Sequence, residues 1–419
     1  ATMASPEAGS IWFIHPYAGG PGVGRYDRPF HLARHWQALG RSTVVLTPSE
    51  HHLLDTPRRP GVEQIDGVTF EFIRSPAYRG NGVGRIVNMA AFTAQLVRQG
   101  DALARRHGRP ALVIASSPHP YAWFAAEGLA RRFGARSVFE VRDLWPLSLV
   151  ELAGVAPSHP LVRFTSWLER RAYRQADAVV SLLPCTRDHM VGLGLDPQRW
   201  HYVPNGIEPD AQASAANSDT PPAALARSWR REGRTVIVYA GALGRPNHVE
   251  SLVQAMALQR DAGQNSAAVI VGRGELQEQL RQMVATLRLE DRVALFEQIP
   301  KKDVQGLLRE ASAGYISLRP EPLFRFGVSP NKLFDYMLAA LPVLFAVRAG
   351  NDPVAEAGCG ISIDPGDPQA ISAAIRRLAA LTEEARQAMG ERGRAYVLQR
   401  HGYRQLAQDY LRLLALEAP

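Results

Sequence analysis

A serine, a lysine and an aspartate stand close together in the segment Gly327–Tyr336, at a spacing that suits the binding of a diphosphate. Ser329 is a good N-cap candidate, and Pro330 suits the first turn of a helix. A helix start offers free backbone N–H groups and a positive dipole end, which bind phosphate. Lys332 adds a positive charge, and Asp335, three residues later, could accept hydrogen bonds from a ribose diol. The alternative is an ordinary capped helix with a Lys–Asp pair on its surface.

Two glycine-containing loops in the same half of the chain could also contact phosphate. Gly241–Arg245 directly follows an apolar run, and its Gly244 and Arg245 combine close backbone approach with a side chain that binds phosphate oxygens. Gly272 and Gly274 follow the next apolar run. A glycine turn with an exposed arginine is the alternative for the first loop, and an isolated G-x-G pair has little specificity.

A third glycine-rich loop, Tyr17–Arg25, lies near the start of the chain and includes Gly19 and Gly20. Gly19 and Gly24 have the spacing of a phosphate-binding P-loop. Arg25 and Tyr26, however, occupy the positions of the Lys-Ser/Thr pair that would contact phosphates and Mg²⁺. The sequence therefore argues against an ATPase of the P-loop class.

Polar residues that could act at a reacting centre follow two apolar runs of the first half. Arg142 and Asp143 follow the run that ends at Val141, and His119 stands between two prolines. The alternatives are a buried Arg–Asp ion pair that fixes its loop and a loop histidine without a role.

Apolar strand-like runs alternate with helical patterns, which predicts an α/β fold with mostly parallel sheets. The following list gives the expected strands and then the expected helices: strands at 10–15, 43–47, 111–116, 137–141, 178–183, 235–240, 267–271, 293–297, 313–318 and 343–346; helices at 28–39, 121–133, 161–175, 249–260, from 275 and at 403–416. We expect two Rossmann-like domains, 1–205 and 206–402. We expect a linker at 210–222 and a C-terminal segment, 403–419, that packs back on the first domain.

The composition is that of a globular protein, with 419 residues, 46% hydrophobic and 21% charged. A net charge of +8 favours anionic partners, although an arginine-rich composition is a sufficient alternative, and no nucleic-acid-binding motif is present. No apolar stretch has the roughly 20 residues of a membrane span, and the N-terminus does not read as a signal peptide. Cys185 and Cys359 are expected to be buried free thiols in a reducing cytoplasm.

The segment Gly327–Tyr336, with Pro342-Val343 after it, resembles the donor-binding motif of the glycosyltransferase family 4 group of retaining GT-B enzymes. This resemblance implies that the donor contacts are Ser329, Pro330, Asn331, Lys332 and Asp335. Many members of the family have the pattern E-x7-E here. Asp335 takes the second acidic position and Gly327 the first, so the first glutamate is absent, with Glu321 as a conceivable substitute.

The glycine loops resemble further parts of the same family. Gly241–Arg245 looks like its G-x-x-G-[KR] loop, which implies that Gly244 and Arg245 contact the donor diphosphate, although Ser251 stands where many relatives have a second lysine. Gly272 and Gly274 look like the loop beside the nucleobase. The Tyr17–Arg25 loop resembles the opening segment, which implies that Gly19 and Gly20 lie near the donor phosphates.

Val141–Pro146 and Ser75–Arg85 resemble segments of bacterial family 4 transferases that build O-antigen and capsule, including the N-acetyl-L-fucosamine transferase type. The resemblance implies that Asp143 and His119 are catalytic, although other members have a histidine in the loop of Asp143. The implied acceptor contacts are Tyr78, Arg79, Asn81 and Arg142.

The resemblance implies a retaining transfer of a sugar, of the N-acetylated hexosamine type, from a UDP-sugar to a glycan or lipid-linked acceptor. No Asp-x-Asp occurs in the chain, so we expect neither a metal nor another cofactor. We expect a cytoplasmic location, with the helix Leu161–Arg174 either against the anionic inner membrane or simply solvated. A GT-B epimerase or phosphorylase and a catalytically degenerate sugar-nucleotide-binding protein remain as alternatives.

Overall fold

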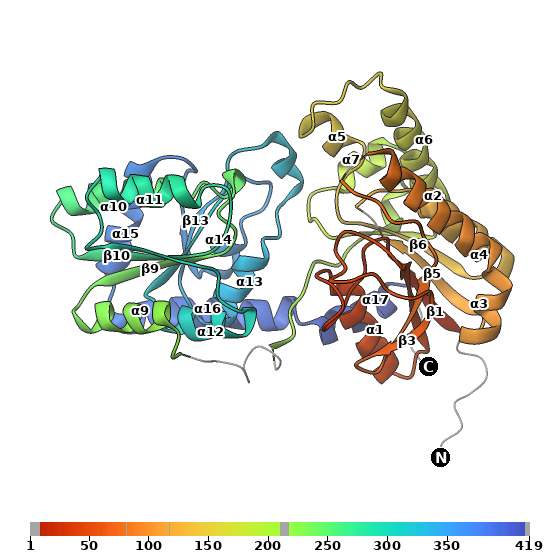
Figure 1. Ribbon diagram of the computed structural model, residues 1–419, viewed down its shortest axis with the longest axis horizontal. Helices are drawn as coiled ribbons and strands as arrows, with labels where there is room; N and C mark the ends of the chain where they lie inside the picture. Colours follow the sequence, from red (N-terminus) through yellow and green to blue (C-terminus); the bar gives the residue numbers. More distant parts are fainter. Residues whose placement is uncertain (1–8, 81, 117, 210–217, 415–419) are drawn as a thin grey trace, which may run out of the picture. The chain divides into compact units, whose positions relative to one another are not determined.

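The computed structural model describes residues 9–80, 82–116, 118–209 and 218–414. The chain divides into two compact units. Unit 1 comprises residues 1–206 together with 403–419, and unit 2 comprises Ile207–Gly402 (Figure 1). The boundary expected after residue 205 lies one residue from this division. Part of the predicted linker, 210–217, is outside the described residues. The prediction was wrong at its other end, because Pro221 and Pro222 form the first turn of a helix.

The strands and helices of unit 1 alternate for most of its length. In order they are β1 (Ser10–Ile14), α1 (Arg28–Ala38), β2 (Thr43–Pro48), β3 (Gly61–Ile65), β4 (Val68–Ile73), α2 (Val83–Arg98), α3 (Gly100–His107), β5 (Pro110–Ser116), α4 (Trp123–Phe133), β6 (Arg136–Val141), α5 (Leu147–Glu151), α6 (Pro160–Gln175), β7 (Ala178–Ser181), α7 (Arg187–Gly192), β8 (Trp200–Tyr202) and α17 (Tyr403–Leu413).

The described strands of unit 1 form one sheet in the order β3-β4-β2-β1-β5-β6-β7-β8. All neighbours are parallel except β3 and β4, which form an antiparallel hairpin at one edge. The turn of this hairpin is Asp66-Gly67, where both residues have positive φ, as hairpin turns require. The chain reverses direction across the sheet between β1 and β5, so their two loops diverge there. This topological switch point is where ligands bind in such sheets.

The C-terminal helix α17 packs on unit 1, against α1. The indole Nε1 of Trp36 on α1 donates to the backbone oxygen of Ala407 at 3.0 Å. Several side chains of α17, among them Tyr403 and Tyr410, enter a core that includes Ile11 and Leu112 of the sheet. The described helix ends at Leu413, and residues 415–416 of the expected helix lie outside the described residues.

A buried ion pair lies behind α17 in unit 1. The Arg28 guanidinium binds the Glu140 carboxylate, with nitrogen–oxygen distances of 3.2 and 3.3 Å, and both side chains are almost fully buried. Arg28 also donates to the backbone oxygens of Val203 and Pro204, and the hydroxyl of Tyr410 donates to Glu140 at 3.0 Å. The segment that leaves unit 1 and the helix that returns to it are therefore bound to the same pair.

Unit 2 continues the alternation. Its elements are α9 (Pro221–Arg231), β9 (Thr235–Ala240), α10 (Glu250–Asp261), β10 (Ser266–Val271), α11 (Gln277–Thr286), β11 (Val293–Phe296), α12 (Lys301–Arg309), β12 (Ala313–Ser317), α13 (Asn331–Leu338), β13 (Val343–Ala346), α14 (Pro353–Ala357), β14 (Gly360–Ser362), α15 (Pro368–Ala379) and α16 (Glu383–Arg400).

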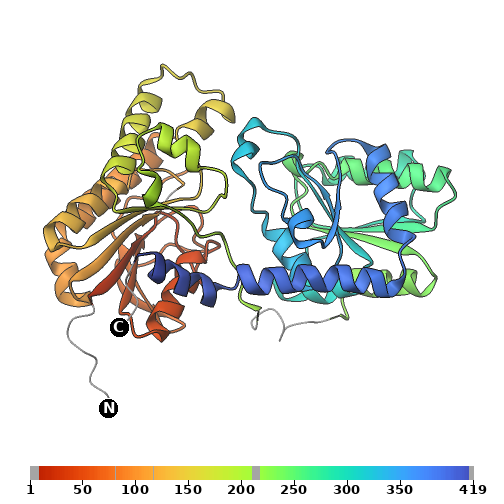
Figure 2. The same ribbon diagram turned by 180° about the vertical axis from the view of Figure 1, so that it is seen from behind.

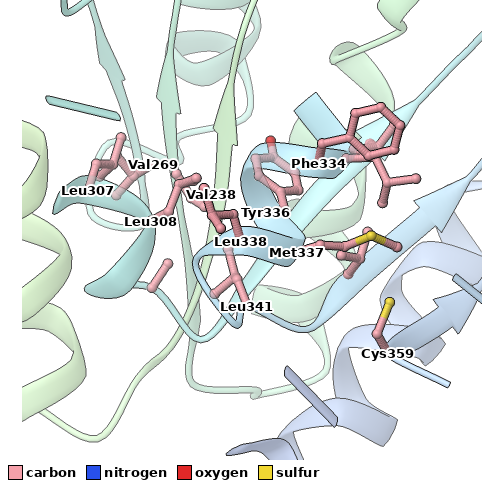
Figure 3. Close-up of a cluster of buried hydrophobic side chains, with 14 of the residues drawn as sticks. Val238, Val269, Leu307, Leu308, Phe334, Tyr336, Met337, Leu338, Leu341 and Cys359 are labelled. Atoms are coloured by element: carbon pink, nitrogen blue, oxygen red, sulfur yellow. The ribbon is translucent and has the colours of Figure 1, made fainter. Parts of the chain in front are cut away.

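The described strands of unit 2 form a parallel sheet in the order β11-β10-β9-β12-β13-β14. Its strands are nearly continuous apolar runs because both faces are covered, one by α10, α11 and α15 and the other by α9, α12, α13 and α16 (Figures 1 and 2). Figure 3 shows the second of these layers, in which Tyr336 and Met337 of α13 pack beside Val238 and Cys359. This packing fixes α13 on the sheet beside the switch point between β9 and β12.

Candidate functional site

The loops after β9 and β10 lie backbone to backbone at the carboxyl ends of the unit 2 strands. A Cβ on Gly272 would lie 1.9 Å from the Gly241 oxygen, and one on Gly274 would lie 2.5 Å from the Leu243 backbone. The N–H of Leu243 donates to the oxygen of Arg273 at 2.9 Å. This close approach requires glycine at 272 and 274. Main-chain atoms therefore line this part of the switch point.

Lys332, at the start of α13, lies directly over the first of these loops. A Cβ on Gly241 would lie 2.5 Å from the Lys332 Cδ, and the ammonium donates to Asn247 Oδ1 at 3.3 Å. The ammonium is also 5.6 Å from the ring centre of Tyr239. Burial lowers the pKa of Lys332, and the Asp335 charge opposes this effect. The structure thus brings Lys332 onto the Gly241–Arg245 loop.

The other predicted residues of the 327–336 segment surround the start of α13. Asp335 is partly buried and its backbone oxygen accepts from the Gln305 amide, whereas Asn331 is exposed. The helix begins at Asn331 with Pro330 as its N-cap, so the prediction that Ser329 caps the helix was wrong. The Ser329 Oγ is buried and has no hydrogen-bond partner among the described residues. The Ser329 hydroxyl thus lies beside the start of α13 but is closed off from solvent.

Arg245 is exposed in the turn after Gly244, where its backbone is held from two sides. The Arg245 N–H donates to Glu275 Oε1 at 3.1 Å, and its oxygen accepts from Arg319 Nε at 2.8 Å. Sequence reasoning missed Arg319 and Asn247. Arg319 lies just beyond β12, and its position after an apolar run was the available signal.

Two sequence departures have structural explanations. Gly327 has φ of +102°, a conformation that strains any side-chain-bearing residue, so this backbone disfavours a glutamate at that position. Ser251, where relatives have a lysine, is fully buried and its Oγ lies 2.6 Å from the Tyr315 hydroxyl. Glu321 is exposed.

The switch point of unit 1 is lined by side chains. Tyr17 follows β1 and His119 follows β5, and the Tyr17 hydroxyl lies 3.2 Å from His119 Nε2. Arg85 of α2 donates to the same hydroxyl at 2.9 Å. The hydroxyl proton is thus directed to Nε2, which then acts as the acceptor of a neutral imidazole. Burial, and secondarily the Arg85 charge, lower the pKa of His119 to about 3. His119 is therefore neutral at physiological pH.

Aromatic and histidine side chains extend this cluster over the loops after β2 and β4. The Tyr78 hydroxyl lies 2.9 Å from His52 Nδ1, and the His52 ring is 4.7 Å from that of Tyr17. Of the predicted acceptor residues, Tyr78 is therefore within the cluster. Arg79 is exposed one residue beyond it, and Asn81 lies outside the described residues.

Arg142 and Asp143 follow β6, next to β5 in the sheet. The Arg142 guanidinium lies over the Tyr26 ring at 4.7 Å. Asp143 reaches solvent, yet desolvation by the surrounding loop raises its pKa and the Arg142 charge opposes that rise. Trp145, two residues further along, packs edge-on against the His119 ring, with 6.0 Å between the ring centroids. No hydrogen bond joins the two predicted catalytic residues, His119 and Asp143, in the described part of the chain.

Gly19 and Gly20 also lie in unit 1, whereas the other predicted donor-binding residues lie in unit 2. A Cβ on Gly19 would lie 2.7 Å from the Gly24 backbone, and the Gly19 N–H donates to the Tyr26 oxygen at 2.8 Å. The glycines let this loop fold tightly on itself beside the cluster around Tyr17.

Both units match known domain families. Residues 22–206 match the family described as Glycosyl transferase 4-like domain, and residues 224–396 match the family described as Glycosyl transferases group 1. The first match lies in unit 1 and the second in unit 2. Both units are glycosyltransferase domains.

The fold of the chain is similar to that of solved structures of the GT-B class. A sucrose-phosphate synthase from Thermosynechococcus elongatus superposes with a TM-score of 0.69 at 19% identity, covering 97% of this chain and 99% of that chain. Anabaena HepE, in complex with UDP and glucose, superposes with a TM-score of 0.63 at 17% identity and the same coverage. At these identities the similarity establishes the fold.

A curated relative is the 2-deoxystreptamine glucosyltransferase of Streptomyces kanamyceticus, 26% identical over 222 residues, which are 52% of this chain and 55% of the relative. The chain spans about half the length of the curated relatives it matches.

The structure also bears on two expectations from the sequence, the absence of a membrane span and the burial of both cysteines. Among the described helices, none is both long and apolar enough to cross a bilayer. Cys359 is buried as expected, but Cys185 is exposed after β7, so the expectation of two buried thiols was wrong for that residue.

Proposed function

We propose that the chain transfers a sugar from a UDP-sugar to an acceptor hydroxyl, with retention of anomeric configuration and without a metal. The observation that carries this proposal is the position of the Lys332 ammonium on the Gly241–Arg245 loop after β9, which packs against the loop after β10. A cation, open backbone and the start of α13 meet there, at the switch point where nucleotides bind in such sheets.

The chemistry proposed for this site is electrostatic. When the sugar leaves, negative charge develops on the diphosphate oxygen, and cations held in place stabilise it. Lys332 and Arg245 supply those charges, so that the reaction needs no divalent ion. A bound diphosphate would also favour protonated Lys332, whose pKa burial lowers. Asp335 is assigned to the ribose hydroxyls, and the complex of HepE with UDP supports uridine as the base.

The first test is calorimetry with UDP and GDP in EDTA. We expect micromolar binding of UDP, weakened about 10- to 100-fold by Lys332→Ala, because a charge-assisted contact to phosphate contributes about 1.5–3 kcal/mol. Lys302→Ala removes an exposed lysine from α12 of the same unit and is the matched control. Absence of binding to both nucleotides would contradict the donor site.

Retention is assigned to a same-face displacement in which the departing phosphate oxygen assists the acceptor proton. Asp143, whose pKa is raised by desolvation, is assigned to the reacting centre. His119 is neutral and bound to Tyr17, so its proposed role is to position the acceptor. NMR of the anomeric proton of the product tests this assignment, and an inverted product would contradict it.

The proposed donor sugar is an N-acetylated hexosamine, and the proposed acceptor is a glycan or lipid-linked precursor of O-antigen, lipopolysaccharide or capsule. The support is the resemblance of Val141–Pro146 and Ser75–Arg85 to transferases of that class. The proposed location is the cytoplasm, peripheral to the inner membrane. Transfer to a free monosaccharide at the same rate as to a lipid-linked glycan would contradict the acceptor class.

A catalytically degenerate sugar-nucleotide-binding protein is the second candidate, favoured by the glycine at 327. Gly327 occupies the position of the first acidic residue of the family motif, and its φ of +102° disfavours a glutamate there. Tight UDP binding without transfer to any acceptor would establish that candidate in place of the first.

A further inference from the structure

Three exposed aromatic rings touch one another on helices α4 and α6 of unit 1. Phe124 of α4 is 37% exposed, and Phe164 and Trp167 of α6 are 45% and 50% exposed. The ring centroids of each pair lie 6.0–6.2 Å apart. A contiguous group of exposed apolar side chains on a protein surface marks an interaction site.

These rings are not needed for the core of unit 1. Helix α6 buries one complete face, which is made of Val162, Thr165, Leu168, Glu169, Ala172 and Tyr173. Phe164 and Trp167 project from the opposite face. The fold therefore leaves two large rings of one helix in solvent while its packing face is already filled.

Arginines surround the rings. Arg163, Arg170 and Arg174 are exposed on the same helix, and Arg171 lies 5.7 Å over the Trp167 ring while it pairs with Glu127. We call the set Phe124, Phe164, Trp167, Arg163, Arg170 and Arg174 the aromatic–arginine face.

The acidic residue of α6 does not offset these charges. Glu169 is buried and accepts a hydrogen bond from the Tyr173 hydroxyl at 3.0 Å. Burial raises the pKa of Glu169 to about 8, against the opposing effects of Tyr173 and Arg170. At neutral pH the helix therefore presents arginine charge together with aromatic rings.

The aromatic–arginine face adjoins the unit 1 switch point. The ring of Tyr121 stacks on Phe164 with a centroid distance of 6.4 Å and an interplanar angle of 12°, and its hydroxyl lies 2.8 Å from Thr165 Oγ1. On its other side Tyr121 lies 4.9 Å from the ring of His119. Ring contacts thus run without a break from the exposed face to the loop after β5.

We propose that the aromatic–arginine face docks on a bilayer surface that contains anionic phospholipids. Aromatic rings favour the boundary between headgroups and acyl chains, and arginines bind the lipid phosphates. Helix α2 packs beside α4 (Figures 1 and 2). It carries three further exposed apolar side chains, Val83, Ile86 and Val87. The proposal rests on the proposed function, because docking here would present the loop of His119 to an acceptor held in the membrane.

Co-sedimentation of the full chain with vesicles tests the proposal. We expect binding to vesicles that contain phosphatidylglycerol and little binding to phosphatidylcholine alone. Arg163→Gln with Arg170→Gln should lower the partition coefficient about 30-fold, since each surface arginine contributes about a factor of five. Arg376→Gln with Arg377→Gln removes the same charge from exposed positions of α15 in unit 2 and should leave binding unchanged.

The rings are tested separately by fluorescence quenching with brominated lipid. The wild type should be quenched on anionic vesicles, and Trp167→Phe should lower that quenching, because Trp167 is 50% exposed whereas Trp12, Trp36, Trp123 and Trp229 are buried and Trp145 and Trp200 are partly buried. Wild-type protein that remains in the supernatant with anionic vesicles overturns the proposal. An equal loss of binding in the α15 variant also overturns it, since net charge alone would then explain the effect.

Calorimetry with UDP on the Arg163→Gln, Arg170→Gln variant separates this proposal from the proposed function. We expect UDP binding equal to that of the wild type, because both arginines lie in unit 1 and the donor loops lie in unit 2. Vesicle binding without UDP binding would contradict the donor site and leave docking intact. UDP binding without vesicle binding would contradict docking alone.

Discussion

The two switch points arise in the same way, where the strand order reverses direction across a sheet, but they present different chemistry. In unit 2 the loops after β9 and β10 are packed through glycines, so main-chain atoms and the cation of Lys332 line the site. In unit 1 the loops after β1 and β5 meet through side chains, with Tyr17 between Arg85 and His119. The topology fixes where each switch point forms, and the residues beyond the strand ends decide whether main-chain atoms or side chains line it.

The largest expected effect comes from the buried charge that supports unit 1. Arg28→Met would leave Glu140 buried without its cation, and the loss of one partner of a buried ion pair costs about 3–5 kcal/mol of unfolding free energy. Urea unfolding measures this cost. The double variant Arg28→Met, Glu140→Gln should recover part of the loss, and a single variant as stable as the wild type would contradict the role of the pair.

Gly272→Ala tests the main-chain lining of unit 2. The added Cβ would lie 1.9 Å from the Gly241 oxygen, so a loop must move, at a cost of about 3 kcal/mol and with weaker UDP binding. Gly20→Ala in unit 1 is the comparison, because the nearest atom to its Cβ would be in the Phe30 ring at 3.3 Å, a far milder contact than the 1.9 Å at Gly272. Equal stability and equal UDP affinity of the two variants would show that the unit 2 loops are not tightly packed.

Buried histidines should make unit 1 sensitive to acid, and His119 is one of three in its described part, beside His15 and His51. The pKa of His119 is lowered to about 3, whereas an unfolded histidine titrates near 6.5. The unfolded state therefore binds more protons between those values, and stability falls as the pH drops through 6.5 toward 3. From pH 7 to pH 5 this single group should cost on the order of 2 kcal/mol. His119→Gln should reduce the pH dependence of unfolding by about that amount and leave the share of His15 and His51, and parallel curves for variant and wild type would contradict the assignment.

The smallest effect concerns one hydroxyl. Tyr17→Phe removes the group that joins Arg85 to His119 and should cost about 1 kcal/mol of unfolding free energy, with a larger loss of acceptor affinity than of UDP affinity. Tyr121→Phe, which loses a hydrogen bond to Thr165, is the control. If both variants bound acceptor like the wild type, side chains of unit 1 would not define the acceptor site.

The sequence predicted the strands that end at these sites because each is a buried apolar run, as at Thr235–Ala240. It also predicted that Lys332 and Arg245 belong to one site, by resemblance. It did not reveal the hydrogen bond from Lys332 to Asn247. The two residues are 85 positions apart in the sequence, and only the order of the strands in the sheet brings them together. The hairpin of β3 and β4 was missed although Asp66-Gly67 between alternating residues is a local signal for it.

The Tyr17–Arg85–His119 cluster was missed for a different reason. Its members stand 68 and 102 residues apart and share no motif, so only the order of strands brings them together. Ser329 was misassigned as a cap because the chain enters α13 one residue later, through Pro330.

The buried Arg28–Glu140 pair binds both the segment that leaves unit 1, at Val203 and Pro204, and helix α17, which returns to it. This arrangement has a consequence for synthesis on the ribosome. Unit 2 is inserted within unit 1, since residues 403 onward complete unit 1. Domains fold as their residues emerge, N-terminal parts first. Unit 2 can therefore finish before Tyr410 reaches Glu140, and the nascent unit 1 waits without the α17 contacts to that carboxylate and to the Trp36 indole until α17 leaves the exit tunnel.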